Sequence, residues 1–330
     1  MFAVVLVGGF GTRLRPLTNE IPKPMLPVAH RPMIVPLVER LAAGGVTDVV
    51  LALGFRPEPF YSAFPDRCHG ETRLHYAIEP EPLDTAGAIG FAARDVGIDD
   101  TFVVANGDVI CDVDIGGLVD RHRSDGAVAT LHLTEVADPS AFGVVETDEH
   151  RIVQRFVEKP APGVTPSRQI NAGTYVMEPE VLDLIPPLQR CSVEREIFPT
   201  LVDGGRLLGI ATDDYWLDTG RPDQYLQANL DAVDGTRQHR DPAVHTEARI
   251  DATASVDQSV VGAMAAVDGE AVVHESLLLP GAVVQRGARL ERSIVAGVVG
   301  PGAVVVDSVI GAGYHVPAGS DVLAERLPAP

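Results

Sequence analysis

The chain has 330 residues, of which 45% are hydrophobic, and its 46 acidic and 26 basic side chains give a formal net charge of −20. This length and apolar content suit one large globular domain plus a smaller one, and they exclude a disordered protein. A surface this acidic repels nucleic acid and anionic lipid, and we therefore expect neither as a partner. For the same reason, an anionic substrate would need locally concentrated cations or a metal ion.

The cysteines and the apolar runs of the chain indicate a cytoplasmic protein. The cysteines are three and scattered, which indicates reduced thiols, and no Cys/His cluster suggests a zinc site. The opening apolar run is too short for a signal peptide and has no basic flank before it. No stretch approaches the ~20 apolar residues that span a bilayer. We therefore expect a cytoplasmic location and no membrane partner.

Short apolar runs alternate with helical patterns from residue 1 to about residue 234. The alternation predicts βαβ units and an α/β fold with a Rossmann-like, mostly parallel sheet. The predicted strands are Phe2–Val7, Asp48–Leu53, Arg73–Ile78 and Thr101–Ala105, and the predicted helices are Met33–Ala43, Thr85–Arg94 and Ile115–Arg123. We expect four further strands to form an insertion that roofs the sheet, before a closing helix: Ala127–His132, Phe142–Glu146, Arg151–Glu158, Asn171–Met177 and the helix Gln224–Val233.

The composition changes to valine, alanine and glycine after a polar, proline-containing segment. Apolar residues then fall six apart at Val267, Val273 and Leu279, which is typical of a left-handed parallel β-helix. We expect about four imperfect coils; the alternative is an irregular β domain. The predicted boundaries are a first domain over 1–234, a linker over 235–248 and a hexapeptide-repeat domain over 249–330.

The stretch after the first strand, GGFGTRLRPLTNEIPKPMLPV, combines bare backbone with cations. It fits neither the dinucleotide fingerprint nor a Walker A loop, yet Gly8, Gly9 and Gly11 offer backbone N–H groups to a triphosphate. Arg13 adds a fork-shaped cation, and flanking prolines restrict the backbone of Lys23. The alternative for the loop is an ordinary glycine-rich turn.

Two aspartates follow short apolar strands. Asp108 follows TFVVA and Asp218 follows YWL, and ligands of open α/β sheets bind where strands end. Two carboxylates that meet a nucleoside triphosphate can hold Mg²⁺. The alternatives are a turn residue for Asp108 and a helix N-cap for Asp218.

A third group of polar residues suits a sugar phosphate. Glu158 and Asn171 can accept and donate hydrogen bonds to sugar hydroxyls, and Lys159 suits a phosphate monoester. The alternatives are an exposed ion pair and a turn. The C-terminal histidines could serve an acyltransferase, but they share no catalytic spacing, so we expect surface roles for His245, His274 and His315.

Together these motifs resemble the sugar-nucleotide pyrophosphorylases, nucleotidyltransferases that join a sugar 1-phosphate to a nucleoside triphosphate. The motifs GGFGTRLRPLT, PKPMLPV, NGDV, FGVV, VEKP, NAGTYVMEP, SVEREIFP and YWLDTGRPDQYL occur in the family's order. SVEREIFP and YWLDTGRP most resemble the mannose-1-phosphate guanylyltransferases. The resemblance covers residues 2–234, and the hexapeptide tail is also similar to the family.

The resemblance implies a role for each matching residue. Catalysis would fall to Arg13, Lys23, Asp108 and Asp218, of which Asp108 and Asp218 would bind Mg²⁺. The nucleotide would be held by Leu6, Gly8, Gly9, Gly11, Thr12, Arg13, Glu79, Thr85, Ala86 and Gly87. The sugar phosphate would be held by Gly143, Glu158, Lys159 and Asn171. Asp84 stands where glycine is common in the base-reading segment.

The implied reaction is a Mg-assisted, in-line attack of the sugar phosphate on the α-phosphorus, which releases pyrophosphate. Guanine presents two adjacent donors that one carboxylate can accept, so Glu79 or Glu81 favours GTP, with mannose 1-phosphate as the sugar. The alternatives are a glucose-1-phosphate enzyme that uses dTTP, UTP or ATP, a non-catalytic sugar-nucleotide-binding subunit, and a bifunctional acyltransferase. We expect the β-helix to mediate homo-oligomer formation.

Overall fold

The computed structural model describes residues 1–9, 11–54, 57–161, 163–237 and 239–329, and it divides into two compact units. Unit 1 comprises Met1–Gly9 and Ile34–Trp216. Unit 2 comprises Phe10–Met33 and Leu217–Pro330, so a segment near the N-terminus is grouped with the C-terminal part of the chain. The domain boundary at residue 234 stays a prediction. Among the described residues no helix is long and apolar enough to cross a membrane.

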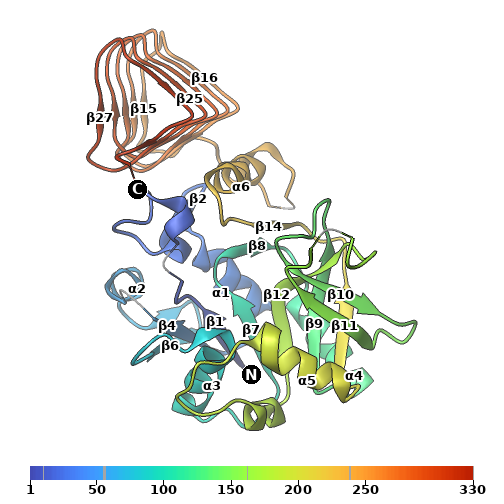
Figure 1. Cartoon of the computed structure of the whole chain (residues 1–330). Coiled ribbons are helices and arrows are strands. Elements are labelled where there is room, and N and C mark those ends of the chain that lie inside the picture. Colours follow the sequence, from blue (N-terminus) through green and yellow to red (C-terminus); the bar gives the residue numbers. More distant parts are fainter. Residues whose placement is uncertain (10, 55–56, 162, 238, 330) are drawn as a thin grey trace. The chain divides into compact units, whose positions relative to one another are not determined.

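Unit 1 is built on a ten-stranded mixed sheet with a parallel centre (Figure 1). The parallel strands are β1 (Phe2–Leu6), β4 (Asp48–Leu53), β6 (Thr72–Ile78) and β7 (Phe102–Asn106). All six residues of β4 are buried, as expected of a strand with helices or loops on both faces. The helices are α1 (Ile34–Ala43), α2 (Glu58–Ala63), α3 (Asp84–Val96), α4 (Ile115–Asp125) and α5 (Phe198–Asp203).

The strands of the middle region extend this same sheet, so the prediction that they form a separate roof is wrong. Strand β12 pairs antiparallel with β7, and β9 and β10 pair with β12. The physical reason lies in β12 itself, because most of its residues are buried, as in a central strand. These strands are β9 (Ala129–Glu135), β10 (Gly143–Thr147), β11 (Val153–Glu158), β12 (Gln169–Met177) and β13 (Leu207–Ala211). Strand β5 (Cys68–His69) pairs with β6 at the other edge of the sheet, and β8 (Val109–Cys111) and β14 (Trp216–Asp218) lie outside it.

Unit 2 contains a left-handed parallel β-helix, as predicted, but it has five coils rather than four. Three flat walls of five parallel strands stack into a triangular prism (Figure 1). The first wall is β15 (Arg249–Ile250), β18 (Ala266–Val267), β21 (Val283–Val284), β24 (Val298–Val299) and β27 (His315–Val316). The second is β16 (Ser255–Asp257), β19 (Val272–His274), β22 (Arg289–Glu291), β25 (Val304–Val306) and β28 (Asp321–Leu323). The third is β17 (Val260–Val261), β20 (Leu277–Leu278), β23 (Ile294–Val295), β26 (Val309–Ile310) and β29 (Arg326–Leu327).

A row of buried serines links successive coils at one corner of the β-helix. The backbone N–H of Ser276 donates to the Oγ of Ser259 at 3.0 Å, and Ser293 and Ser308 repeat this bond at 3.1 Å each. The separation is 17 residues for the first pair and 15 for Ser293 and Ser308. The coil between Ser293 and Ser308 is therefore two residues shorter than the coil between Ser259 and Ser276. This difference interrupts the repeat of the sequence, which explains why only four coils were predicted.

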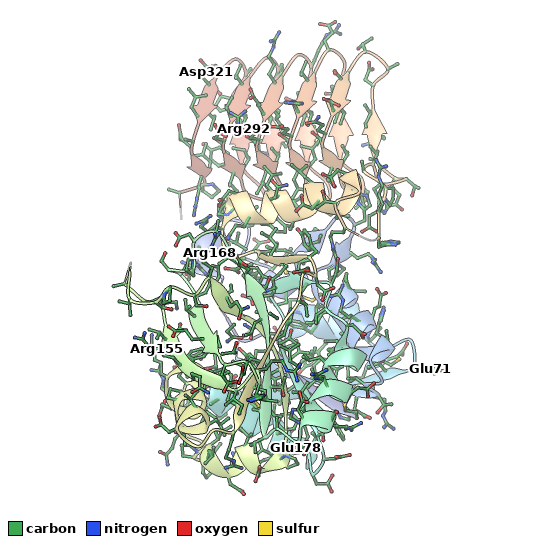
Figure 2. All side chains as sticks on the ribbon, turned by 90° about the vertical axis from the view of Figure 1, so that its right-hand side faces the viewer. Glu71, Arg155, Arg168, Glu178, Arg292 and Asp321 are labelled. Carbon is green, nitrogen blue, oxygen red and sulfur yellow. The ribbon has the colours of Figure 1, made fainter. Side chains whose placement is uncertain are left out.

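The rest of unit 2 is a short N-terminal segment and one long helix. The segment holds two 3₁₀ turns (Thr12–Leu14 and Lys23–Met25) and the strands β2 (Pro27–Val28) and β3 (Arg31–Pro32). Helix α6 (Pro222–Asp234) lies along the stacked coils and contacts β17 and β20 (Figure 2). Arg221 is the N-cap of α6, which excludes the helix N-cap alternative for Asp218.

Candidate active site

The central strands of unit 1 end side by side and bring their loops into contact. Leu6 pairs with Ala52 of β4 and with Asn106 of β7. A Cβ atom on Gly8 would lie 3.1 Å from the backbone nitrogen of Gly54, so the two loops approach as closely as glycine permits. The carboxyl ends of these strands are therefore a closely packed edge, where ligands of α/β sheets bind.

Asp108 lies at this edge, in the turn that follows β7. The backbone N–H of Gly107 donates to the carbonyl oxygen of Leu6 at 2.9 Å. A Cβ atom on Gly107 would lie 2.7 Å from Cγ1 of Val7, so the turn packs tightly against the end of β1. The structure thus holds Asp108 beside the loop that begins at Gly8.

Two of the residues predicted for the sugar, Asn171 and Glu158, lie near the hydroxyl group of Tyr175. Asn171 Nδ2 donates to this hydroxyl at 2.9 Å, and Tyr175 is completely buried. Burial raises the pKa of Tyr175, and the negative charges of nearby acids, Glu194 first and then Glu158 and Asp108, raise it further. Two predicted sugar ligands and one predicted metal ligand therefore share one region of unit 1.

Gly143 and Lys159 flank this region. Gly143 pairs with Glu158 across β10 and β11, and a Cβ atom on Gly143 would lie 3.0 Å from Oε2 of Glu158. Lys159 Nζ lies 3.2 Å from Oε1 of Glu158, and its side chain is 60% exposed. An ion pair so exposed contributes little to stability, so Lys159 remains available to an incoming phosphate.

The predicted base-reading segment is bonded to the segment around Cys191. The backbone N–H groups of Ala86 and Gly87 donate to the carbonyl oxygen of Cys191 at 2.9 and 3.1 Å. Thr85 Oγ1 donates to Oε2 of Glu194 at 2.7 Å. Asp84 has a φ of 63°, a conformation that glycine adopts without strain.

The structure distinguishes the two candidate carboxylates for base recognition. Glu79 is partly buried, its Oε2 accepts from the backbone N–H of Leu83 at 2.9 Å, and its Oε1 lies 3.5 Å from the Cβ position of Gly8. Burial raises the pKa of Glu79, which the bond from Leu83 only partly offsets. Glu81 is exposed. Glu79 is therefore the carboxylate that is fixed beside the glycine loop.

Unit 2 brings together three residues that lie far apart in the sequence. Lys23 is only 4% exposed, and its Nζ lies 3.5 Å from Oδ1 of Asp218. A Cβ atom on Gly220 would lie 2.7 Å from Nη2 of Arg13 and 3.0 Å from Oδ2 of Asp218, so both groups border this glycine. Two cations and one carboxylate thus form a compact cluster.

The glycine loop itself is divided between the units. Leu6, Gly8 and Gly9 belong to unit 1, whereas Gly11, Thr12 and Arg13 belong to unit 2. Gly11 has a φ of 58°, and a Cβ atom there would lie 3.0 Å from Cγ2 of Thr18. The predicted metal ligands are divided in the same way, Asp108 in unit 1 and Asp218 in unit 2.

Sequence reasoning missed three residues of these clusters. Tyr175 and Glu194 were given no role, and Trp216 was not connected to β12, although its Nε1 donates to the carbonyl oxygen of Ala172 at 2.8 Å. All three lie within motifs that the sequence analysis quoted. The composition gives a further signal for candidate site residues. The chain has only two lysines, Lys23 and Lys159, and both belong to motifs of the predicted site.

Family models and sequence relatives match most of this chain. A family model described as nucleotidyl transferase matches residues 2–235, and one described as GlmU-like, C-terminal hexapeptide matches residues 231–300. A mannose-1-phosphate guanylyltransferase from Mycobacterium tuberculosis is 40% identical over 96% of this chain and 81% of its own length. A mannose-1-phosphate guanyltransferase from Schizosaccharomyces pombe is 41% identical over 73% of this chain, but the match spans 66% of that protein.

A solved structure is also similar. The crystal structure of HddC from Yersinia pseudotuberculosis complexed with GMP-PN has a TM-score of 0.59 and 28% identity, and it covers 69% of this chain and 97% of that one. The prediction of a sugar-nucleotide pyrophosphorylase-like enzyme, made from the order of the motifs, is confirmed. The chain belongs to the nucleotidyl transferase family.

Proposed function

We propose that this enzyme transfers GMP from GTP to mannose 1-phosphate and so produces GDP-mannose and pyrophosphate. The relatives named mannose-1-phosphate guanylyltransferase support this choice of substrates. The observation that carries the proposal is the cluster of Arg13, Lys23 and Asp218, because two cations beside a carboxylate suit a triphosphate and its metal ion.

The chemistry needs alignment and charge neutralisation rather than a general base. The phosphate of mannose 1-phosphate is already ionised at neutral pH, and one of its oxygens attacks the α-phosphorus of GTP. The bond between the α-phosphorus and its bridge to the β-phosphate breaks, and pyrophosphate leaves with the electron pair. Two unit charges 4 Å apart repel by ~4 kcal/mol at an effective dielectric constant of 20. Arg13, Lys23 and Lys159 offset this repulsion.

We assign Mg²⁺ to the carboxylates of Asp108 and Asp218. Carboxylate oxygens are the protein ligands that Mg²⁺ prefers, and it completes its coordination with phosphate oxygens and water. The placement of Asp218 beside Arg13 and Lys23 fits an ion that shares a triphosphate with those cations. When bound, the ion would withdraw charge from the α-phosphate and the departing pyrophosphate.

Glu79 is the proposed guanine ligand. Guanine presents its N1–H and N2–H donors side by side, and an ionised carboxylate can accept both. The bond from Leu83 fixes the carboxylate of Glu79, whereas no hydrogen bond fixes the exposed Glu81 among the described residues. Mannose would be held by Gly143, Glu158 and Asn171.

Pyrophosphate release from a substrate matrix tests the proposal. The enzyme is incubated with Mg²⁺ and each of GTP, ATP, UTP and dTTP, crossed with mannose and glucose 1-phosphates. We expect GTP with mannose 1-phosphate to react fastest and chelation by EDTA to abolish turnover. If glucose 1-phosphate reacts faster than mannose 1-phosphate, the assignment of mannose 1-phosphate as the substrate is wrong. Absence of turnover with every pair would favour the non-catalytic, sugar-nucleotide-binding alternative.

The metal assignment has its own test. Asp108→Asn should abolish turnover while binding of mannose 1-phosphate, measured calorimetrically, stays within about threefold, because the sugar ligands are untouched. Asp120→Asn, an exposed aspartate of α4, is the matched control. An active Asp108→Asn enzyme would disprove the role of this carboxylate.

We further propose a cytoplasmic homo-oligomer that assembles through the β-helix, in a chain with domains 1–234 and 249–330 and a linker over 235–248. Large apolar side chains on the second wall support this surface, since Val272 is 38% and Leu323 is 60% exposed. Exposed apolar side chains that lie together mark association surfaces, and Leu323 pairs with the half-buried Val306 on this wall. Light scattering on Leu323→Glu should report a smaller species than the wild type, and an unchanged mass would refute the surface.

A further inference from the structure

The segment that carries Arg13 is in contact with the last coil of the β-helix. Arg326 of β29 donates from Nη1 to the backbone carbonyl oxygen of Arg13 at 2.8 Å. A Cβ atom on Gly311 would lie 2.8 Å from Cγ of Pro16, so the turn after β26 touches the same segment. Both contacts lie within unit 2.

These contacts hold the backbone of Arg13 and leave its side chain exposed. Leu14 and Pro16 are buried, whereas Arg13 is exposed. The local hydrogen bonds are those of a 3₁₀ turn, such as the bond from Leu14 N–H to Gly11 O at 2.9 Å. Because the hydrogen bonds of such turns have poor geometry, a turn of this kind gains order from external contacts.

We propose that the last coil of the β-helix positions Arg13 for the triphosphate, with Arg326 as the positioning residue. This inference rests on the proposed function, in which Arg13 neutralises the phosphates. It assigns the β-helix a part in substrate binding in addition to assembly. Arg326 touches no reacting atom and acts through the main chain of Arg13.

The geometry favours a positioning role over general support of the fold. Arg326 is exposed and its bond crosses between two segments at the surface, so its loss leaves no buried group unsatisfied. The bond fixes the main chain of Arg13, whose guanidinium borders Gly220 together with the carboxylate of Asp218. The guanidinium of Arg326 also adds a positive charge beside the cluster of Arg13 and Lys23, in a chain whose net charge is −20.

Binding of inorganic tripolyphosphate in the presence of Mg²⁺, measured calorimetrically on the full chain, tests the inference without turnover. We expect Arg326→Ala to weaken this binding about fivefold, the loss of one hydrogen bond. Arg326→Lys should recover part of the affinity, since it retains a donor. The matched control is Arg249→Ala, because Arg249 is an exposed arginine of β15, on the first wall of the β-helix, with no side-chain partner among the described residues.

Kinetics and melting temperature separate positioning from folding. Arg326→Ala should raise KM for GTP about fivefold, leave KM for mannose 1-phosphate unchanged and leave the melting temperature within about 1 °C. Gly311→Ala should weaken tripolyphosphate binding too, because its methyl group displaces Pro16.

The outcomes distinguish this inference from the proposed function. Wild-type affinity in Arg326→Ala, or an equal loss in Arg249→Ala, overturns the positioning role even if the enzyme makes GDP-mannose. Fivefold weaker binding in Arg326→Ala supports it even if every substrate pair fails to react. A wild type that does not bind tripolyphosphate overturns both.

Discussion

Replacement of Lys23 by methionine should separate stability from activity. The side chain of Lys23 is buried, and its Nζ lies 3.5 Å from Oδ1 of Asp218. Methionine fills a similar volume without the charge, so Lys23→Met leaves the carboxylate of Asp218 without this cation. The double variant Lys23→Met/Asp218→Asn removes both charges.

The expected magnitudes follow from the distance. At an effective dielectric constant of 20, two unit charges separated by 3.5 Å attract by about 5 kcal/mol. Part of this attraction compensates the burial of both ions, so breaking the pair should cost about 3 kcal/mol of unfolding free energy. Loss of a cation ~4 Å from a phosphate charge removes about 4 kcal/mol, which corresponds to a loss of about 10³ in kcat.

Urea unfolding followed by tryptophan fluorescence provides the stability measurement. The chain has a single tryptophan, Trp216, which lies on the same strand as Asp218. Lys23→Met should shift the unfolding midpoint to lower urea, and the double variant should recover most of that shift. Lys23→Met should release pyrophosphate from GTP and mannose 1-phosphate about 10³-fold more slowly than the wild type, and the double variant should be no faster.

Two results would refute this reasoning. If Lys23→Met retains kcat within tenfold of the wild type, the cation does not act on the phosphates. If the double variant is no more stable than Lys23→Met, the two charges are not coupled in solution. Arg249→Met, on an exposed position of the first wall of the β-helix, serves as the control for loss of a positive charge.

Three further predictions concern other parts of the chain. Affinity for GTP should fall as the pH drops through the pKa of Glu79, which burial raises, because only the ionised carboxylate accepts both guanine donors; titration calorimetry should show this dependence lost in Glu79→Gln and retained in Glu81→Gln. Thr85→Val removes the 2.7 Å bond to Glu194 and should raise KM for GTP about tenfold with kcat nearly unchanged, whereas a changed kcat alone would contradict a role in ground-state binding. Ser293→Ala leaves a buried N–H of the next coil without its acceptor and should cost about 1–3 kcal/mol of unfolding free energy, and an unchanged melting curve would contradict this role.

The parallel centre of the sheet could be predicted because its strands are bounded apolar runs. Asp48–Leu53 was predicted with the bounds that the structure has, since all its residues are buried. The antiparallel half could not be placed in the same way. Periodicity identifies a strand such as β12 but does not say which neighbour it pairs with, and its pairing with β7 depends on the folded sheet.

The charged residues of the candidate site could be predicted because each lies in a short motif that can be identified in the sequence. Lys23 and Asp218 were expected to act together, and the structure places them in an ion pair. The contacts of Trp216 and of Arg326 were not predictable, because each donates to a backbone carbonyl oxygen, which every residue carries and no sequence pattern marks. The partners of such bonds emerge only when distant segments pack.

The row of serines restricts how the length of the β-helix can change. The Oγ atoms of Ser259, Ser276 and Ser293 each accept the backbone N–H of the serine one coil later, whether that coil has 17 or 15 residues, and the Oγ of Ser308 accepts the N–H of Glu325. Deletion of one complete coil would still bring a serine N–H onto a serine oxygen, so the remaining chain keeps its register. A few residues inserted at this corner would instead separate donor from acceptor, so changes smaller than a whole turn, such as the two residues by which these coils differ, have to fall elsewhere in the coil.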